Sequence, residues 1–353
     1  MRIAMISTPF LSVPPRTYGG TELVVYDLVE GLLARDHEVT LFATGDSRTH
    51  ARQHALYPTA QWPPSPFTDL NHVSWAMNRV AHAEYDVVHA HSAVALALGR
   101  LMPPVPLVYT LHHTRDREMS DYYRYFPEVE FVAISQDQSR RETGVRRCTV
   151  IHHGLDPARY RWTEHPGTYV CFVARFAPVK GVHTAIDAAA LAGVPIRVAG
   201  EVHPPDRDYF NQQVEPRLGL EHVTFLGCIG TERKVPLLQR ARALLAPIDW
   251  DEPFGLTFIE AMLSGCPVVT FRRGSVPELI EHGVTGFIAR SPEEMAHLIR
   301  PGGPVDGLDR QRIRAHAVRR FSRERMAAEY ERVYQAAAAR TESAGDPRPI
   351  TAA

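Results

Sequence analysis

The sequence predicts an α/β protein with two doubly wound domains, each built on a parallel sheet. Short apolar runs alternate with helix-length segments along most of the chain, and this alternation is typical of parallel sheets covered by helices on both faces. It starts at Arg2 and starts afresh at Tyr169. A chain of 353 residues also exceeds the size at which a single core keeps growing. We therefore expect one domain over residues 1–160, a second over residues 161–305 and C-terminal helices over residues 306–353.

Apolar runs predict the strands of the first half, and helical periodicity predicts its helices. Residues 53–68 are polar and interrupted by proline, which is typical of a surface excursion, and residues 153–160 are typical of a turn and linker. The expected strands cover residues 2–7, 39–43, 86–91, 106–111, 131–135 and 149–152, and the expected helices cover residues 21–35 and 69–82.

The second half repeats this order of elements. A polar helix is expected after the strand that ends at Gly200, and two charged helices are expected beyond residue 301. Residues 342–353 are typical of a frayed tail. The expected strands cover residues 169–176, 196–200, 223–227, 243–248, 267–271 and 286–289, and the main helices cover residues 182–191, 232–241, 308–320 and 323–340.

Composition and charge narrow the class of protein. Lys and Arg total 39 against 40 for Asp and Glu, so no global field attracts nucleic acid. No apolar run reaches membrane-spanning length, which excludes integral membrane association, while peripheral contact through arginine clusters stays open. The four cysteines are scattered and form no metal-binding pair, so we expect buried thiols in a reducing compartment: Cys148, Cys171, Cys228 and Cys266. A cytoplasmic enzyme is the expectation.

The stretch DWDEPFGLTFIEAMLSGCP, residues 249–267, predicts a loop that leads into a helix. The amides of Gly255, Leu256 and Thr257 fall at the start of that helix, where unpaired N–H groups bind phosphate. Glu252 precedes the helix and Glu260 lies within it, and carboxylates accept hydrogen bonds from neighbouring hydroxyls. The alternative is an ordinary helix with solvated glutamates.

Two further groups follow strands of the first half. The pair Gly19–Gly20 begins a helix, and glycine there lets a ligand approach the backbone closely. A tight strand-to-helix turn explains this pair equally well, and the full GxGxxG fingerprint of a dinucleotide site is absent. His91 and His112 end neighbouring strands, at the edge where parallel sheets bind ligands. A structural role for these histidines remains the alternative.

Two cations flank the first turn of the second domain. Arg175 and Lys180 lie at the carboxyl end of its first strand. A diphosphate bound at Gly255 needs counter-charge, a role that a bound metal fills in other proteins. Fixed cations can stabilise charge on a departing phosphate instead, so we expect neither a metal nor a cofactor. The alternative is a pair of solvated surface cations.

With these motifs in place, the chain resembles the retaining nucleotide-sugar glycosyltransferases of family four, which have the GT-B fold. The resemblance spans nearly the whole sequence. The motifs are also similar to those of a branch that includes antibiotic-pathway transferases. It is carried by YGG at residues 18–20, ARFAPVKG at 174–181, EPFGLTFIEAMLSGCPVV at 252–269 and SVPELIEHGVTGFI at 275–288.

This resemblance implies a role for each matching residue. Arg175 and Lys180 are expected to bind the donor diphosphate and stabilise it as the leaving group. Glu260 is expected to hold the ribose, and Glu252 to contact the transferred sugar, as is His112. The remaining donor contacts are expected from Gly19, Gly20, Gly200, Cys228, Ile229, Gly230, Phe254, Gly255, Leu256 and Thr257.

The resemblance also implies two Rossmann-like domains that face each other across a cleft, with the C-terminal helix crossing back to the first domain. The expected reaction moves a sugar from a nucleotide diphosphate, UDP first and GDP next, to a hydroxyl of a sugar, a lipid-linked molecule or a natural product. Three alternatives stay open: a GT-B phosphorylase, a sugar-nucleotide epimerase and, after these, a non-catalytic sugar-nucleotide-binding protein.

Overall fold

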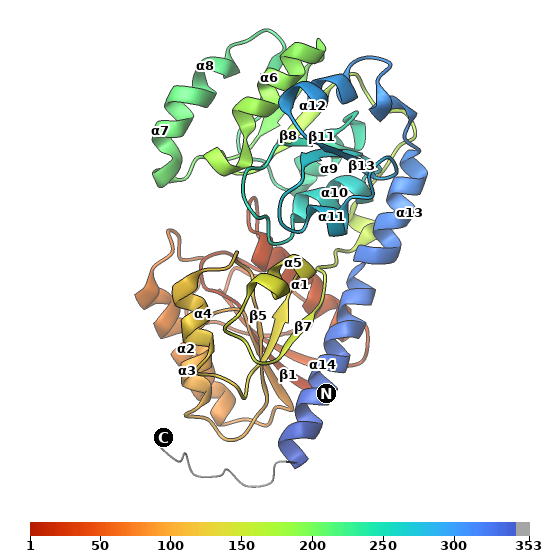
Figure 1. Cartoon of the computed structure of the whole chain (residues 1–353). Coiled ribbons are helices and arrows are strands. Elements are labelled where there is room, and N and C mark those ends of the chain that lie inside the picture. The colour runs from red at the N-terminus through yellow and green to blue at the C-terminus, as the bar shows by residue number, and fades with distance from the viewer. Residues whose placement is uncertain (344–353) are drawn as a thin grey trace. The chain divides into compact units, whose positions relative to one another are not determined.

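The structure is a computed structural model that describes residues 1–343, and it divides into two compact units (Figure 1). Unit 1 comprises Met1–Pro15, Gly19–Gly154 and the chain from Arg323 onward, and unit 2 comprises Arg16–Tyr18 and Leu155–Ser322. The first boundary therefore lies after Gly154 and not after residue 160. The C-terminal helices do not form a segment of their own, because one belongs to each unit. The tail expected over residues 342–353 lies almost entirely outside the described residues.

Unit 1 is built on a seven-stranded sheet in the order β3-β2-β1-β4-β5-β6-β7, with every pairing parallel. The polar edge strand β3 was not expected, because a three-residue polar segment carries no apolar signal. The strands are β1 Arg2–Ile6, β2 Glu38–Phe42, β3 Arg52–His54, β4 Val87–Ala90, β5 Leu107–Thr110, β6 Glu130–Ala133 and β7 Cys148–Val150.

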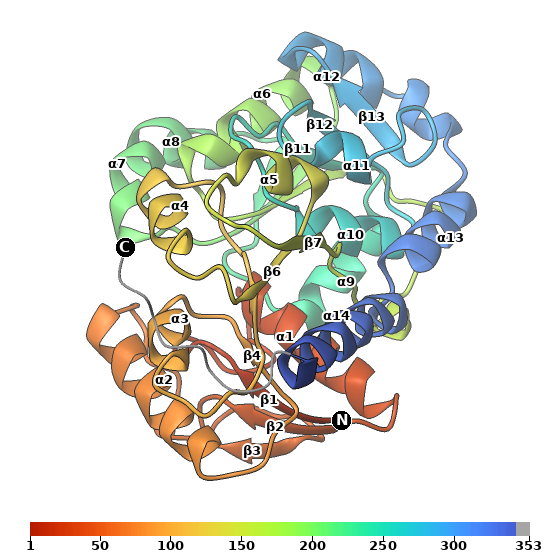
Figure 2. The ribbon, with the colours of Figure 1, turned by 60° about the horizontal axis from the view of Figure 1, so that its bottom comes forward.

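Helices cover both faces of this sheet. In both views α2 and α3 lie on one face, and α1 and α14 lie on the other (Figures 1 and 2). Gly31 of α1 allows α14 to approach closely, since a Cβ there would lie 2.9 Å from Cβ of Ala327. The helices of unit 1 are α1 Gly20–Leu33, α2 Pro66–Ala81, α3 Val94–Gly99, α4 Arg117–Tyr123, α5 Gln136–Arg141 and α14 Arg323–Ser343.

Unit 2 is built on a six-stranded parallel sheet in the order β10-β9-β8-β11-β12-β13. Its main core fills the space between the sheet and the pair α6 and α12, while α9 and α13 flank α10. The strands are β8 Val170–Val173, β9 Ile196–Ala199, β10 Val223–Phe225, β11 Leu244–Ala246, β12 Val268–Phe271 and β13 Gly286–Ala289. The helices are α6 Val182–Ala192, α7 Arg207–Tyr209, α8 Glu215–Leu218, α9 Thr231–Arg240, α10 Leu256–Leu263, α11 Val276–Leu279, α12 Pro292–Ile299 and α13 Arg310–Phe321.

The order of strands in both sheets reverses beside the first strand, so each sheet has the switch point at which open α/β sheets bind ligands. His91 follows β4, Arg175 follows β8 and Glu252 follows β11, which are strands that border these points. Within the described part of the chain, no helix is both long enough and apolar enough to cross a membrane.

Candidate functional site

The site of unit 2 is organised by the start of α10. Gly255 caps this helix in the left-handed region at φ 95°, and a Cβ there would lie 2.7 Å from the ring of Phe258. The loop before it is held by Ser275, whose hydroxyl donates to the carbonyl of Phe254 over 2.7 Å. The amides of Gly255, Leu256 and Thr257 thus lie at the first turn of α10, where helix geometry supplies them with no partner. This arrangement suits an anion.

Glu252 and Lys180 form a partly buried ion pair beside this helix start. Nζ of Lys180 lies 2.5 Å from Oε2 of Glu252, and the indole N–H of Trp250 donates to the same oxygen over 2.9 Å. The ammonium also lies 4.3 Å from the centre of the Trp250 ring, at cation–π distance. Lys180, which was expected to bind phosphate, and Glu252, which was expected to contact the sugar, therefore form an ion pair with each other in this structure.

Glu260 makes a second ion pair, with a residue that the sequence reasoning missed. Lys234 of α9 reaches Oε1 of Glu260 at 2.6 Å, and the hydroxyl of Tyr160 donates to the same oxygen over 3.1 Å. Tyr160 belongs to the segment that was expected to be only a turn and linker. Composition could have drawn attention to Lys234, because Lys180 and Lys234 are the only lysines among the 39 Lys and Arg residues.

The two pairs share one geometry. Among the described residues, every polar partner of the Glu252 carboxylate binds Oε2, and every polar partner of the Glu260 carboxylate binds Oε1. One oxygen of each carboxylate is therefore left to accept hydrogen bonds. Two fixed carboxylates with a lysine each suit a ligand that carries both hydroxyls and negative charge.

Arg175 lies near acidic residues that follow β9. Its Nε is 3.5 Å from Oδ2 of Asp206, and its NH1 is 3.5 Å from Nδ1 of His203. Nε2 of His203 lies 2.7 Å from the carboxylate of Glu201. Because arginine only donates, His203 accepts at Nδ1 and carries its hydrogen at Nε2. Glu201 thus orients a histidine that contacts Arg175.

Two expected donor-site glycines have a packing reason within unit 2. A Cβ at Gly200 would lie 2.0 Å from the carbonyl oxygen of Ala174, and one at Gly230 would lie 2.5 Å from that of Arg16. Both positions therefore require glycine whether or not a ligand is bound. Their donor-binding role stays a prediction.

Cys228 and Ile229 lie in the loop between β10 and α9, next to Gly230. Ile229 is buried, but Cys228 is exposed, so the expectation of four buried cysteines is wrong at this position. Cys171 and Cys266 are buried, whereas Cys148 is only half-buried. Across residues 1–343, no group of three or more His, Cys, Asp or Glu side chains is arranged to hold a metal ion.

The candidate residues of unit 1 come from α1 and from the ends of β4 and β5. Gly19 caps α1 at φ 152°, and a Cβ there would lie 2.8 Å from both Leu11 and Pro15. Gly20 is the exposed first residue of this 14-residue helix. The glycine pair therefore forms a tight strand-to-helix turn that also presents a helix start.

A row of neutral histidines leads to His112. Burial lowers the pKa of His89 to about 3 and that of His112 to about 3, and it also holds the pKa of His91 well below its ordinary value. Nδ1 of His91 lies 2.7 Å from Nε2 of His112. His89 is bonded to the hydroxyls of Tyr334 at 2.7 Å and Thr110 at 2.8 Å.

The sulfur of Met5 determines which nitrogen of His112 carries the hydrogen. A thioether can only accept, so its 3.2 Å contact requires Nε2 of His91 to be the protonated nitrogen. Nδ1 of His91 then accepts from Nε2 of His112. Nδ1 of His112 is left as an acceptor, which can receive a hydrogen bond from a ligand hydroxyl.

Both halves of the chain match family models of glycosyltransferases. Residues 18–159 match the family model described as Glycosyltransferase Family 4, and residues 162–300 match the model described as glycosyl transferases group 1. The glycogen synthase of Mycobacterium tuberculosis is 28% identical over 357 residues, with 84% of each chain covered.

Solved structures agree with these matches. AviGT4, a glycosyltransferase involved in avilamycin A biosynthesis, is 25% identical with a TM-score of 0.74, and 96% of this chain and 98% of that chain are covered. HepE of Anabaena, solved in complex with UDP, is 25% identical with a TM-score of 0.71, and 95% of this chain and 100% of that chain are covered. The chain therefore belongs to the glycosyltransferases of the GT-B fold, with an N-terminal domain of family four and a C-terminal domain of group 1.

Proposed function

We propose that this protein transfers a sugar, with retention of anomeric configuration and without a metal, from a nucleotide diphosphate to a hydroxyl acceptor. The observation that carries the proposal is the pairing of both lysines with the two glutamates beside the start of α10. A nucleotide sugar presents the complementary groups, namely a diphosphate and two sets of ring hydroxyls.

The diphosphate binds at the first amides of α10, with Arg175 and Lys180 as its counter-charge. To reach it, Lys180 leaves Glu252, whose carboxylate can then accept hydroxyls of the transferred sugar at Oε1, while Trp250 still holds Oε2. The second pair behaves differently, because Lys234 can stay on Oε1 of Glu260 while Oε2 accepts a ribose hydroxyl. We assign to His112 a hydrogen bond from a hydroxyl of the transferred sugar to its Nδ1.

In the transfer step, the bond between the anomeric carbon and the phosphate oxygen breaks while the acceptor oxygen bonds to the same face of that carbon. The acceptor proton passes to the departing phosphate oxygen, so no protein base is required. Arg175 and Lys180 stabilise the charge that builds on this leaving group. The histidine row contributes no acid at neutral pH, because burial lowers the pKa of His112 to about 3.

We infer UDP as the nucleotide, with GDP next. The similarity to HepE, whose structure was solved with UDP, supports this order. The acceptor is a hydroxyl of a sugar, a lipid-linked molecule or a natural product.

A thermal-shift screen against UDP, GDP and their sugars tests donor binding, since a ligand that binds only the folded state raises its melting temperature. We expect UDP and UDP-sugars to give the largest rise. NMR of the transfer product should then show the anomeric configuration of the donor, and excess EDTA should leave the rate unchanged. Strict dependence on a divalent metal contradicts the role of the two cations.

The same assays separate the alternatives. Release of a sugar 1-phosphate that depends on added phosphate indicates a phosphorylase. Conversion of the donor to an isomeric nucleotide sugar without an acceptor indicates an epimerase. Donor binding with no turnover under any condition indicates a binding protein.

A further inference from the structure

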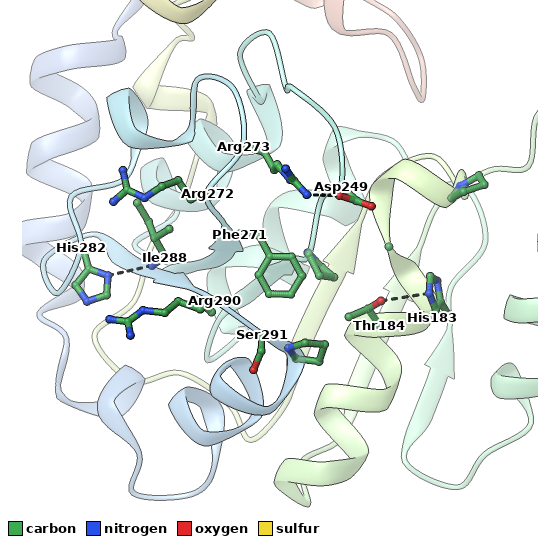
Figure 3. A pocket seen from close by; sticks show the side chains of 15 residues that line it. His183, Thr184, Asp249, Phe271, Arg272, Arg273, His282, Ile288, Arg290 and Ser291 are labelled. Carbon is green, nitrogen blue, oxygen red and sulfur yellow. Dashed lines mark hydrogen bonds and ion pairs between the residues drawn. The ribbon is translucent and has the colours of Figure 1, made fainter.

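A cavity of about 740 Å³ opens on unit 2 (Figure 3), and it is separate from the residues that we assign to the donor site. It lies where β12 and β13 end and where α6 and α12 begin. Its wall is formed by segments 271–273 and 288–292 and by Pro178, Gly181, His183 and Thr184, among others. Arg175, Lys180, Glu252 and Glu260 do not line it. Its volume is within the range that holds small-molecule ligands.

One end of the cavity is basic. Figure 3 shows Arg272, Arg290 and His282 gathered there. Both arginines are exposed, and within residues 1–343 neither has a carboxylate within ion-pair distance. Arg273, by contrast, is neutralised by Asp249 at 2.6 Å. Two guanidinium groups are therefore available to an anion, and their planar forks match phosphate oxygens.

His282 adds a directed donor to this end. The backbone N–H of Ile288 donates to Nδ1 of His282 over 3.2 Å. In the neutral ring the hydrogen must then lie on Nε2, so the free side of the ring donates. In the protonated ring Nδ1 could not accept this bond. The fold thus fixes His282 as a hydrogen-bond donor beside the two arginines.

The middle of the cavity is apolar and its far end is polar. The half-buried ring of Phe271 lies at the centre (Figure 3), and Ile288 also lines the cavity. Thr184 and His183 lie at the far end, 3.3 Å apart between Oγ1 and Nε2. A ligand with a phosphate at one end and a hydroxyl-bearing ring therefore finds complementary groups along the whole length.

We propose that this cavity is a second ligand site, which binds the phosphate monoester of a sugar with its phosphate at Arg272 and Arg290 and its ring on Phe271. The proposal goes beyond the transfer reaction, because it needs none of the donor-site residues. The site is nevertheless close to Lys180 along the chain. Asp249 lines the cavity, and its amide donates to the carbonyl of Val179 over 2.8 Å.

Calorimetric titration of the full chain with glucose 6-phosphate tests this site, with saturating UDP present to occupy the donor site. We expect a single binding event. Affinity should fall about tenfold for each of Arg272→Ala and Arg290→Ala, since each removes a charge-assisted contact. Arg312→Ala is the matched control, because Arg312 is an exposed arginine of unit 2 outside the cavity, and it should bind as the natural chain does.

Two further titrations use inorganic phosphate as the ligand and Lys180→Ala as the protein. Phosphate alone should bind at least tenfold more weakly than the sugar phosphate, and this difference should shrink in Phe271→Leu. The proposal is overturned if no heat is observed, or if Arg312→Ala weakens binding as much as the cavity variants do. It is also overturned if Lys180→Ala abolishes binding while the cavity variants do not. The Lys180→Ala titration is done without UDP. Its result therefore does not depend on whether UDP binds at the proposed donor site, and a failure of that assignment is distinguishable from a failure of this proposal.

Discussion

At the scale of single residues, the proposed donor site contains two ion pairs, whose charges cancel within unit 2. Each of the two lysines binds one oxygen of one glutamate, and the side chains of Lys180 and Lys234 are only 16% and 13% exposed. A bound nucleotide sugar would cover both. Because all other side-chain cations are arginines or histidines, these two lysines carry the only side-chain amines, which amine-reactive reagents can modify.

We predict that UDP slows the acetylation of Lys180 and Lys234 several-fold, as measured by mass spectrometry of peptides after brief treatment with an amine-reactive reagent. The amino group of Met1 is the internal control, because it belongs to unit 1 and bonds to His37. Equal rates with and without UDP at both lysines would show that the nucleotide binds elsewhere.

At the scale of elements, α14 is attached to the sheet of unit 1 by buried hydroxyl groups. Tyr330 bonds to Thr110 at 2.8 Å, and Tyr334 bonds to His89 at 2.7 Å. All four side chains are fully buried. Buried polar groups cost free energy when a partner is removed, so these bonds fix where the helix lies.

Tyr334→Phe should therefore destabilise the protein by roughly 1–3 kcal/mol, since it leaves Nδ1 of His89 buried without a partner. The melting temperature should fall by several degrees. Tyr125→Phe is the control, because Tyr125 is 70% exposed and its hydroxyl should not affect stability. Identical melting curves for the two variants would contradict this account of how α14 is held.

The neutral histidines of β4 and β5 predict how stability depends on pH. Burial lowers the pKa of His89 and that of His112 to about 3, whereas both titrate near 6.5 when unfolded. Between these pH values the unfolded chain binds more protons, so their contribution is complete above pH 6.5 and is lost progressively as pH falls toward 3.

We expect the melting temperature to decrease already between pH 7 and pH 5, where most carboxylates remain ionised. His89→Gln should melt lower at pH 7 but lose less between pH 7 and pH 5, because it has one buried histidine fewer. Thermal melts across this range measure both effects. An unchanged slope in the variant would mean that His89 does not contribute to the acid sensitivity.

At the scale of the whole molecule, the fold could be predicted from the sequence because the alternation of strands and helices repeats along the chain. Each apolar run and each helical segment is short, yet their alternation defines two parallel sheets, and both sheets have the expected central strands. The motif residues also lie where motif spacing put them, since Glu252, Gly255 and Glu260 are within one continuous loop and helix.

Contacts between residues far apart in the chain were not predictable in the same way. Lys234 and Tyr160 meet Glu260 across 26 and 100 residues, and no local pattern records such pairs. The hydrogen bond between Tyr334 and His89 was missed for the same reason, whereas the edge strand β3 was missed because it is short and polar. The cavity beside Phe271 is formed by the ends of four elements, so only the folded chain reveals it.

The central claim is that Lys180 leaves Glu252 to bind the donor diphosphate. It is tested by UDP release from a UDP-sugar that stabilises the protein, measured for Lys180→Ala with Lys180→Arg and Arg312→Ala as controls. We predict a loss of about 10²–10³-fold in kcat for Lys180→Ala, partial activity for Lys180→Arg, full activity for Arg312→Ala and a folded protein in every case. Near-normal turnover by a folded Lys180→Ala would contradict the account.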